Sequence, residues 1–340
     1  MAVAPLTAVI VAHNSLADLR RSLPPLLEQL TADDELIVVD NASSDGLGEE
    51  LARLAPRARL LSMGRNAGFA AGANAGAAAA RGELLVLLNP DAVVEPGWAQ
   101  ATRAPIGGEW TAWMGLVTLA DGELINTSGG VLHFTGFGWA GQIDEPLTAA
   151  PSRPKEVGFL SGACLAIPRA TWAGVGGFPA EFFMYCEDVD LSLRLRLNGG
   201  RIAVIPDARV RHAYEFDKGG LKWRLLERNR WATILRTYPT PLLALVAPAL
   251  IGTELAVWLV AARDGWLRMK LLATGDTLRA LPRLLRERQA IQASAQISAL
   301  RFSDELTPTL DSPYFGGVGR QPLLRIGMVS YWRLVRRLLA

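Results

Sequence analysis

The sequence is poor in the residues that build disulfide-stapled or zinc-stapled folds. Cys164 and Cys186 are its only cysteines, and it has three histidines in 340 residues. Two cysteines without a CxxC or His-rich spacing support neither a disulfide framework nor a zinc site. A reducing compartment is therefore expected.

The sequence also lacks a strong charge of either sign. Its formal net charge is +2, and half of its residues are hydrophobic. A nucleic-acid binder would carry a strongly basic balance, and a disordered chain would be poor in apolar residues. We therefore expect a folded protein that binds no nucleic acid, built as one large domain or as a domain with an appendage.

The first fifteen residues, "MAVAPLTAVIVAHNS", lack the pattern of a signal peptide. They have no basic n-region and no small-residue cleavage site, and their apolar run is too short to cross a bilayer. The run is typical of a first β-strand, and a cytoplasmic location is expected.

What is present is an alternation of β-branched runs and helical stretches over residues 6–98. The expected strands are "TAVIVA", "ELIVVD", "ARLLSM" and "ELLVLL". This rhythm predicts an α/β fold with a doubly wound, mostly parallel sheet. Ligands of such sheets bind at the carboxyl ends of the strands.

Polar residues follow each of the four expected strands: Asn14, Asp40, Asn66, and Asn89 with Asp91. Each is also ordinary turn chemistry. Four strands that end alike nevertheless favour a nucleotide site, because a carboxylate accepts from a ribose hydroxyl and amides pair with a base edge. The sequence has no GxGxxG after the first strand and no GxxxxGK[ST], so neither a dinucleotide nor a P-loop site is supported.

The ordered motifs resemble those of glycosyltransferase family 2, close to its bacterial rhamnosyltransferase-like branch. They are "VIVAHNS", "IVVDNASSDG", "GRNAGFAAGANAG", "LLNPDAVVEPG", "FLSGACLAIPRATWAGVGGFPAEFFMYCEDVDLSLRLRLNGG" and "VRHAYEF". The resemblance covers residues 6–238 and implies a GT-A fold, a nucleotide-sugar donor and inversion at the anomeric carbon. It also implies a domain over 1–238, with a nucleotide-binding half at 1–100 and an acceptor and catalytic half at 101–238.

The resemblance places the catalytic carboxylates in "FFMYCEDVDLSLRLRLNGG", residues 182–200. It implies that Asp188 is the general base and that Glu187 contacts or orients the acceptor. Periodicity alone leaves helix and strand open after Cys186, and the resemblance favours a helix. Asp190 is expected to favour the helix N-terminus and to pair with Arg194.

The same resemblance implies a donor site with a divalent metal. Asp40, Asn66 and Asn74 would hold the nucleoside, together with Asn14 and Asn89. "NPDA" at 89–92 occupies the slot where many GT-A enzymes have Asp-x-Asp, with Asn89 in place of the first acid. Asp91 remains to hold Mg²⁺ or Mn²⁺, and His212 is either a second metal or diphosphate ligand or an ordinary packing histidine.

The last third, residues 239–340, changes character. Residues 241–262 are apolar and long enough to cross a bilayer, but Pro248 and Glu254 count against a spanning helix. Two later stretches, 264–290 and 323–340, interleave Arg and Lys with Leu, Val and Trp, as interfacial amphipathic helices do. We expect peripheral or monotopic attachment to the inner face of the cell membrane. The alternative is a helical appendage that packs on the sheet or on a second subunit, as in a homodimer.

These observations predict an inverting transferase that moves a sugar to a lipid-linked or cell-surface glycan. Rhamnose from dTDP-rhamnose is the favoured donor. Two alternatives stay open: the same fold using a UDP-sugar on a protein or small molecule, and a catalytically silent GT-A module that binds a glycan or a partner at the membrane.

Overall fold

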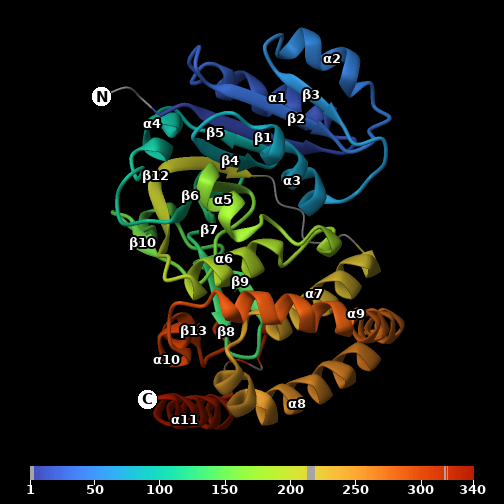
Figure 1. Cartoon of the computed structure of the whole chain (residues 1–340), viewed down its shortest axis with the longest axis vertical. Coiled ribbons are helices and arrows are strands. Elements are labelled where there is room, and N and C mark those ends of the chain that lie inside the picture. The colour runs from blue at the N-terminus through green and yellow to red at the C-terminus, as the bar shows by residue number, and fades with distance from the viewer. Residues whose placement is uncertain (1–3, 213–218, 318, 320) are drawn as a thin grey trace. The chain divides into compact units, whose positions relative to one another are not determined.

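The computed structural model of the chain describes residues 4–212, 219–317, 319 and 321–340 (Figure 1). Within the "VRHAYEF" motif, His212 is described, while residues 213–216 lie outside the described residues.

Strands and helices alternate along the first half of the chain, and helices dominate its end. The strands are β1 (Leu6–Ala12), β2 (Glu35–Asp40), β3 (Arg59–Ser62), β4 (Leu84–Leu88), β5 (Ala92–Val94), β6 (Ala112–Thr118), β7 (Ile125–Thr127), β8 (Gly130–His133), β9 (Gly138–Ala140), β10 (Lys155–Glu156), β11 (Cys164–Pro168), β12 (Ile202–His212) and β13 (Leu306–Thr307). The helices are α1 (Leu16–Leu27), α2 (Leu47–Leu54), α3 (Phe69–Ala79), α4 (Trp98–Arg103), α5 (Arg169–Val175), α6 (Glu187–Leu197), α7 (Gly219–Thr237), α8 (Thr240–Arg263), α9 (Leu267–Ala293), α10 (Ala299–Phe302) and α11 (Pro322–Leu339).

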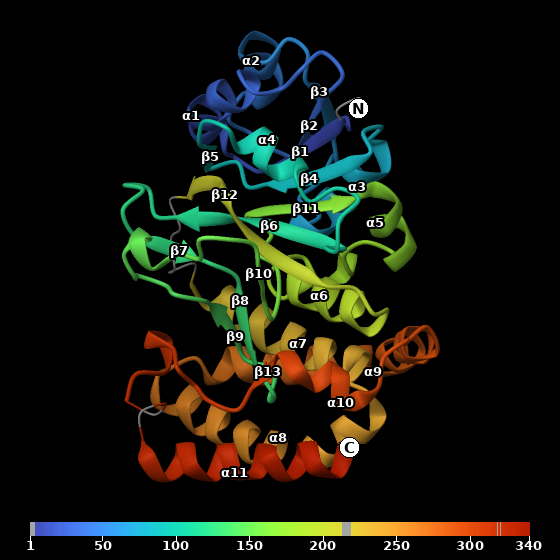
Figure 2. The same cartoon turned by 90° about the vertical axis from the view of Figure 1, so that its left-hand side faces the viewer.

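The large sheet runs in the order β10-β12-β6-β11-β4-β1-β2-β3 (Figure 2). Strands β4, β1, β2 and β3 pair in parallel, as the alternating pattern predicts. Strand β11 is antiparallel to both β4 and β6, and β12 pairs in parallel with β6. The predicted α/β fold with a mostly parallel central sheet is therefore confirmed. Strand β11 is inserted antiparallel beside β4, and the short strands β5, β7 and β10 also pair antiparallel.

The sheet is covered closely because α3 is built from small residues. A Cβ on Gly72 would lie 2.6 Å from Val11 Cγ1, and one on Gly76 would lie 2.3 Å from Val9 Cγ1. Both contacts are shorter than real Cβ contacts, so no larger residue fits there without a shift. The run "AAGANAGAAAA" thus lets α3 rest directly on β1 and fixes the strand ends beneath its N-terminus.

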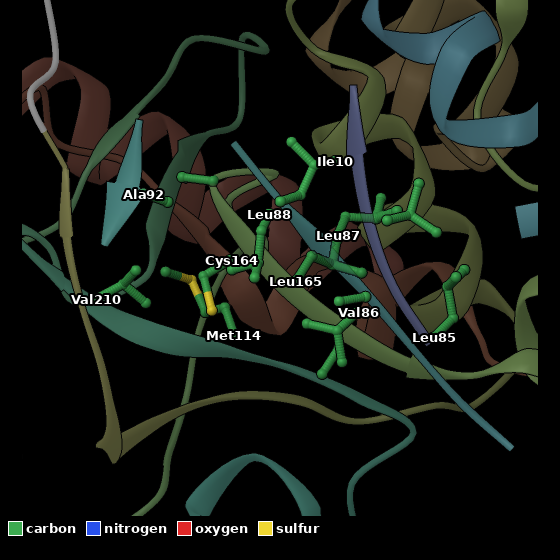
Figure 3. Close-up of a cluster of buried hydrophobic side chains, with 14 of the residues drawn as sticks. Ile10, Leu85, Val86, Leu87, Leu88, Ala92, Met114, Cys164, Leu165 and Val210 are labelled. Carbon is green, nitrogen blue, oxygen red and sulfur yellow. The ribbon is translucent and has the colours of Figure 1, made fainter. Parts of the chain in front are cut away.

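Buried strands form the core of the sheet. All five residues of β4, "LLVLL", are buried, because this strand lies between β1 and β11 with apolar side chains on both faces. Figure 3 shows Leu85–Leu88 of β4 among Ile10 of β1, Leu165 of β11 and Met114 of β6. This core holds β4 rigidly, and with it the polar residues that follow at Asn89–Asp91.

The chain divides into two compact units. The first comprises residues 1–130, 140–195 and 200–215, and the second comprises 131–139, 196–199 and 216–340. The domain boundary expected between residues 238 and 239 stays a prediction. Helix α7 ends just before that boundary and belongs with the C-terminal helices in the second unit.

The second unit is mainly helical. Helices α7 and α9 pack along each other, and α8 packs on α9 and α11 (Figures 1 and 2). The segment 131–139 joins this unit: β8 pairs with β13, and the Phe134 ring stacks on Trp332 of α11 at 4.9 Å between centroids. The expected C-terminal helices are thus present.

Candidate active site

Three predicted residues meet where β4 and β12 end. His212 Nε2 lies 3.1 Å from Asp91 Oδ1 and 3.1 Å from Asn89 Nδ2. The histidine and the Asn-Pro-Asp turn are about 120 residues apart in sequence, and the pairing of β12 with β5 brings them together, with His212 opposite Ala92. The sequence singled out these residues separately, and the fold gathers them into one cluster.

The cluster offers a carboxylate oxygen and an imidazole nitrogen, a donor pair that can hold a divalent cation such as Mn²⁺. Asp91 Oδ1 and His212 Nε2 lie 3.1 Å apart, so both would be within reach of one bound ion. Among the described residues no group of three or more His, Cys, Asp or Glu side chains is placed to hold a metal. Within the part of the chain that the structure describes, Asp91 and His212 are the two side chains of this cluster that could contact an ion.

Asp188 lies at the start of α6 and is held by backbone N–H groups. Gly162 N donates to its Oδ2 at 3.0 Å, and Val189 N donates to its Oδ1 at 2.8 Å. The side chain is partly exposed. Burial nevertheless raises the pKa of Asp188 to about 6, and the two N–H donors limit the rise. A carboxylate of this kind is ionised near neutral pH and is a stronger proton acceptor than one in water.

Glu187 sits beside it in a drier place. Burial, and then the neighbouring Asp188 charge, raise the pKa of Glu187 well above its usual 4.5. Its Oε2 is buried and has no hydrogen-bond partner within the described part of the protein. A buried, unsatisfied carboxyl oxygen costs stability. A ligand group that reaches this oxygen would remove that cost.

The cluster at His212 and the carboxylate at Asp188 are joined by a short backbone bridge. Asn89 N donates to the carbonyl of Ala163 at 3.1 Å, and the residue before Ala163 is Gly162, whose N–H holds Asp188. The loop before β11 thus connects the end of β4 to the start of α6. This connection joins Asp188 and the Asp91–His212 cluster through hydrogen-bonded backbone.

The turn that precedes α6 is locked against α3. Phe183, Tyr185 and Cys186 all have positive φ, which non-glycine residues rarely adopt. The Phe183 carbonyl accepts from Ala70 N at 3.0 Å, and a Cβ on Gly68 would lie 2.5 Å from that same oxygen. Only glycine fits at position 68, and this close approach keeps the strained turn in place. Phe182 is buried, while Phe183 and Tyr185 are partly buried, next to the carboxylates.

Side-chain hydrogen bonds connect the loops that follow β1, β2 and β3. Asn14 Oδ1 accepts from Ser44 N at 2.8 Å, and Asp40 Oδ1 accepts from Ser43 N at 2.8 Å. Asn66 Oδ1 accepts from Asn41 Nδ2 at 3.0 Å. These predicted residues therefore form one polar corner, in which part of each side chain is used by the loops themselves.

Asn74 is placed differently. Its Nδ2 donates to the Phe178 carbonyl at 2.8 Å, and its Oδ1 accepts from Phe178 N at 2.9 Å. Both amide atoms are thus used to fasten α3 to the loop after α5. This packing role accounts for Asn74, so we leave it out of the nucleoside contacts proposed below.

Asp190 has the expected structural role. Its Oδ1 accepts from Arg194 Nε at 2.6 Å, and the same guanidinium donates to the carbonyls of Val175 and Gly177. The pair anchors α6 to the loop after α5.

The sequence did not predict the roles of Gly162 and Gly68. Both glycines are visible in "FLSGACL" and "NAGFAAG", but the residues they contact, Asp188 and Phe183, lie more than 25 residues away in sequence.

Family models match most of the first unit and part of the second. Residues 7–126 match the model described as glycosyl transferase family 2, and residues 144–287 match glycosyl transferase family group 2. A similar curated protein is N-acetylglucosaminyl-diphospho-decaprenol L-rhamnosyltransferase of Mycobacterium tuberculosis. It is 30% identical over 239 residues, which cover 61% of this chain and 75% of that protein.

Solved structures share the fold at lower identity. GalNAc-T7 with UDP, GalNAc and Mn²⁺ aligns with a TM-score of 0.58 and 16% identity, over 72% of this chain and 50% of that one. Mannosyltransferase PcManGT from Pyrobaculum calidifontis, in complex with GDP-Man and Mn²⁺, aligns with a TM-score of 0.50 and 20% identity, over 85% of each chain. At these identities the likeness shows the fold alone.

Proposed function

Because the chain belongs to glycosyltransferase family 2 and so uses a nucleotide-sugar donor, we propose that it transfers L-rhamnose from dTDP-rhamnose to a lipid-linked glycan, with inversion at the anomeric carbon. The relative's name supports this choice of sugar and acceptor. The observation that carries the proposal is the Asp188 carboxylate, held by two N–H groups and raised in pKa.

In the proposed reaction an acceptor hydroxyl oxygen forms a bond to the anomeric carbon of the donor sugar. The bond from that carbon to the diphosphate breaks, and the nucleoside diphosphate leaves with the electron pair. The hydroxyl proton moves to Asp188, whose raised pKa suits it to that transfer. Positioned general bases contribute about 10²- to 10⁴-fold to such rates.

Glu187 would orient the acceptor. Its buried Oε2 has no partner among the described residues, and its raised pKa favours the protonated form, which donates a hydrogen bond. The aromatic turn before α6 would exclude water, the competing acceptor. Neither role needs Glu187 to gain or lose a proton during turnover.

The nucleoside would bind at the polar corner of β1, β2 and β3. Asp40 keeps one carboxylate oxygen beyond its bond to Ser43, and such an oxygen accepts from a ribose hydroxyl or a base N–H. Asn14 and Asn66 each use their carbonyl oxygen within the corner, so their amide N–H groups are the donors we assign to the nucleotide. Asn89, beside His212, would face the diphosphate.

Asp91 and His212 would hold the divalent cation. When bound, Mg²⁺ or Mn²⁺ would neutralise charge on the leaving diphosphate. Without it, the two side chains satisfy each other through the 3.1 Å contact between Oδ1 and Nε2. The pair is thus kept in position before the donor arrives.

Attachment of the C-terminal helices to the inner face of the cell membrane would bring the enzyme to a lipid-linked acceptor. Helix α8 is long and apolar enough to cross a membrane, with a mean hydropathy of 2.0, and 11% of that stretch is buried in the protein. A core helix would be mostly buried, so this exposure supports contact with lipid.

A melting-temperature panel tests the donor site. The purified chain is heated with dTDP, UDP, GDP and their sugars, with and without Mn²⁺, because a ligand that binds only the native state raises the melting temperature. We expect the largest shift with dTDP-rhamnose and Mn²⁺, a smaller one in Asp91→Ala, and an unchanged one in the exposed control Asp33→Ala. No selective shift with any nucleotide would refute the transferase proposal, and a selective UDP or GDP shift would replace the donor.

A further inference from the structure

One face of α8 is apolar, continuous and exposed. Ile251, Leu255 and Leu259 lie four residues apart along the helix and are 63%, 62% and 73% exposed. Residues four apart share one face of a helix. The opposite face is buried in the second unit through Leu242, Val246, Leu250 and Ala261. Exposed leucines at single sites are common, but a row of them on one helix indicates a contact surface.

Helix α11 extends this apolar surface beside α8. The Tyr331 hydroxyl donates to the Leu245 carbonyl at 2.5 Å, which fixes the two helices side by side (Figures 1 and 2). The inner face of α11 packs through Trp332 and Val335. Its outer residues are again large and exposed: Leu323, Ile326, Leu334 and Leu338. Together with Ile251, Leu255 and Leu259 of α8, these four residues form what we call the α8–α11 face.

The positive charge of residues 219–340 points to an anionic partner for the α8–α11 face. Residues 219–340 contain 18 Lys and Arg against 8 Asp and Glu, a formal net charge of +10, whereas residues 1–218 contain 17 against 25, a net charge of −8. Arg263 at the end of α8 and Arg325, Arg333 and Arg337 on α11 are exposed next to the apolar residues. Exposed apolar helix faces bordered by arginines bind anionic lipid surfaces.

A tryptophan pair lies where α8 leads into α9. Trp223 and Trp266 stack with their ring centroids 5.3 Å apart, and both are partly exposed. Tryptophan is enriched at the boundary between lipid and water, where its ring is apolar and its N–H stays hydrated. Trp266 lies just beyond Arg263 and stacks on Trp223 of α7, which is a position suited to an interfacial anchor.

A partly exposed carboxylate on α8, Glu254, decides how the helix meets the membrane. Glu254 Oε1 lies 2.6 Å from Lys270 Nζ, and its Oε2 lies 3.1 Å from Arg230 Nη2. The indole N–H groups of Trp231 and Trp258 donate to the same carboxylate. Four donors from three helices thus hold one carboxylate in the middle of the most apolar helix.

This network ties α8 into the helical unit. Lys270 is 1% exposed, and both it and Arg230 also contact Glu227, so two cations and two carboxylates balance within the unit. A spanning α8 would have to carry Glu254 into hydrocarbon and leave buried cations with too few partners. Both changes are unfavourable, because unpaired charges are costly in lipid and in protein interiors.

We propose that the α8–α11 face docks on an anionic lipid bilayer, with α8 lying along the membrane plane rather than crossing it. The proposal rests on the proposed function only in that a lipid-linked acceptor gives the docking its use. It assigns the apolar residues to the acyl boundary and the arginines to the lipid phosphates.

Vesicle flotation tests the face. The full chain is mixed with phosphatidylcholine vesicles, with and without phosphatidylglycerol, and the bound fraction is measured. We expect tight binding only when the anionic lipid is present, and release at high salt. The double variant Leu255→Asn/Leu259→Asn should bind at least about tenfold more weakly, because it loses the favourable free energy of moving two leucine side chains from water into the lipid. The control Leu60→Asn removes an exposed leucine of β3 and should bind as the unchanged protein does.

Alkaline carbonate extraction tests the orientation. A chain that lies in the interface is released from the vesicles, whereas a spanning helix stays with them. Retention after carbonate, equal binding of the double variant, or no flotation would each overturn the proposal. So would conversion of a dimer to a monomer by the double variant, because the face would then bind a second copy of the chain.

The same samples separate this inference from the proposed function. Nucleotide melting shifts are measured without vesicles, so a normal dTDP-rhamnose shift with no flotation refutes only the docking. Flotation without any nucleotide shift refutes only the transferase assignment.

Discussion

Replacing Asp188 by Asn should change how the stability of the protein depends on pH. Burial raises the pKa of Asp188 from 3.8 to about 6. A carboxyl whose pKa is raised on folding favours the folded state while it is protonated. Its favourable contribution is complete below pH 3.8 and is lost as the pH rises through about 6.

The magnitude follows from the shift. About two pKa units at 1.36 kcal/mol each correspond to about 3 kcal/mol of unfolding free energy in full, of which about 2 kcal/mol is lost between pH 4 and pH 8. In Asp188→Asn this loss is absent. The variant also mismatches one of the two N–H donors, Gly162 or Val189, but that cost does not depend on pH and cancels when the pH dependences are compared. Relative to the unchanged protein, the variant should gain about 2 kcal/mol as the pH rises from 4 to 8.

Urea unfolding at a series of pH values provides the assay. The exposed control Asp207→Asn should follow the unchanged protein throughout. Glu187 is also raised well above its usual pKa, so Glu187→Gln/Asp188→Asn should remove more of the pH dependence than the single variant. If Asp188→Asn and the unchanged protein kept a constant difference from pH 4 to pH 8, the raised pKa, and the basicity that the proposed mechanism draws from it, would be wrong.

Three further variants test other parts of the structure. Gly68→Ala should destabilise the protein by more than about 1 kcal/mol, because its Cβ meets the Phe183 carbonyl at 2.5 Å and its φ of +87° is strained for alanine. An unchanged unfolding free energy in urea would show that the close contact at Gly68 does not hold the turn before α6. Lys270→Met should cost about 3–5 kcal/mol in the same assay, and adding Glu254→Leu should recover part of that loss; additive losses would show that the two charges are not coupled. His212→Gln should reduce the Mn²⁺-dependent part of the melting shift with dTDP and leave the metal-free part, whereas loss of both parts alike would indicate a packing role.

The frame of the site could be predicted from sequence because it depends on local patterns. The largely apolar runs of β1, β2 and β4 mark buried parallel strands, and each has its polar residue at or just after its carboxyl end. Asp91 and His212 were each singled out from sequence, but their meeting was not predicted, because it depends on the pairing of β12 with β5, about 120 residues apart. The helical state of α6 was not within reach of the pattern either, since "VDLSLRLRL" alternates as a strand would, and only the family resemblance favoured a helix.

The contacts that tune the site depend on residues far apart in sequence. The Gly162 N–H reaches Asp188 across 26 residues, and the Phe183 carbonyl reaches Ala70 across more than 100. The start of α1 shows the same limit on a smaller scale. Ser15 precedes the helix and is a good capping residue, yet it is Asp45, from the loop after β2, that accepts from Leu16 N at 2.8 Å. No local pattern reports which distant loop will supply a partner.

A transfer assay tests the central claim most directly. The purified chain is incubated with Mn²⁺, dTDP-rhamnose and a diphosphate-linked N-acetylglucosamine lipid, and both the glycolipid product and the released dTDP are measured. We expect dTDP release that depends on the acceptor, rises with pH through about 6, and falls by about 10²- to 10⁴-fold in Asp188→Asn. Transfer at an undiminished rate in Asp188→Asn, or no acceptor-dependent release from any nucleotide sugar, would contradict the account.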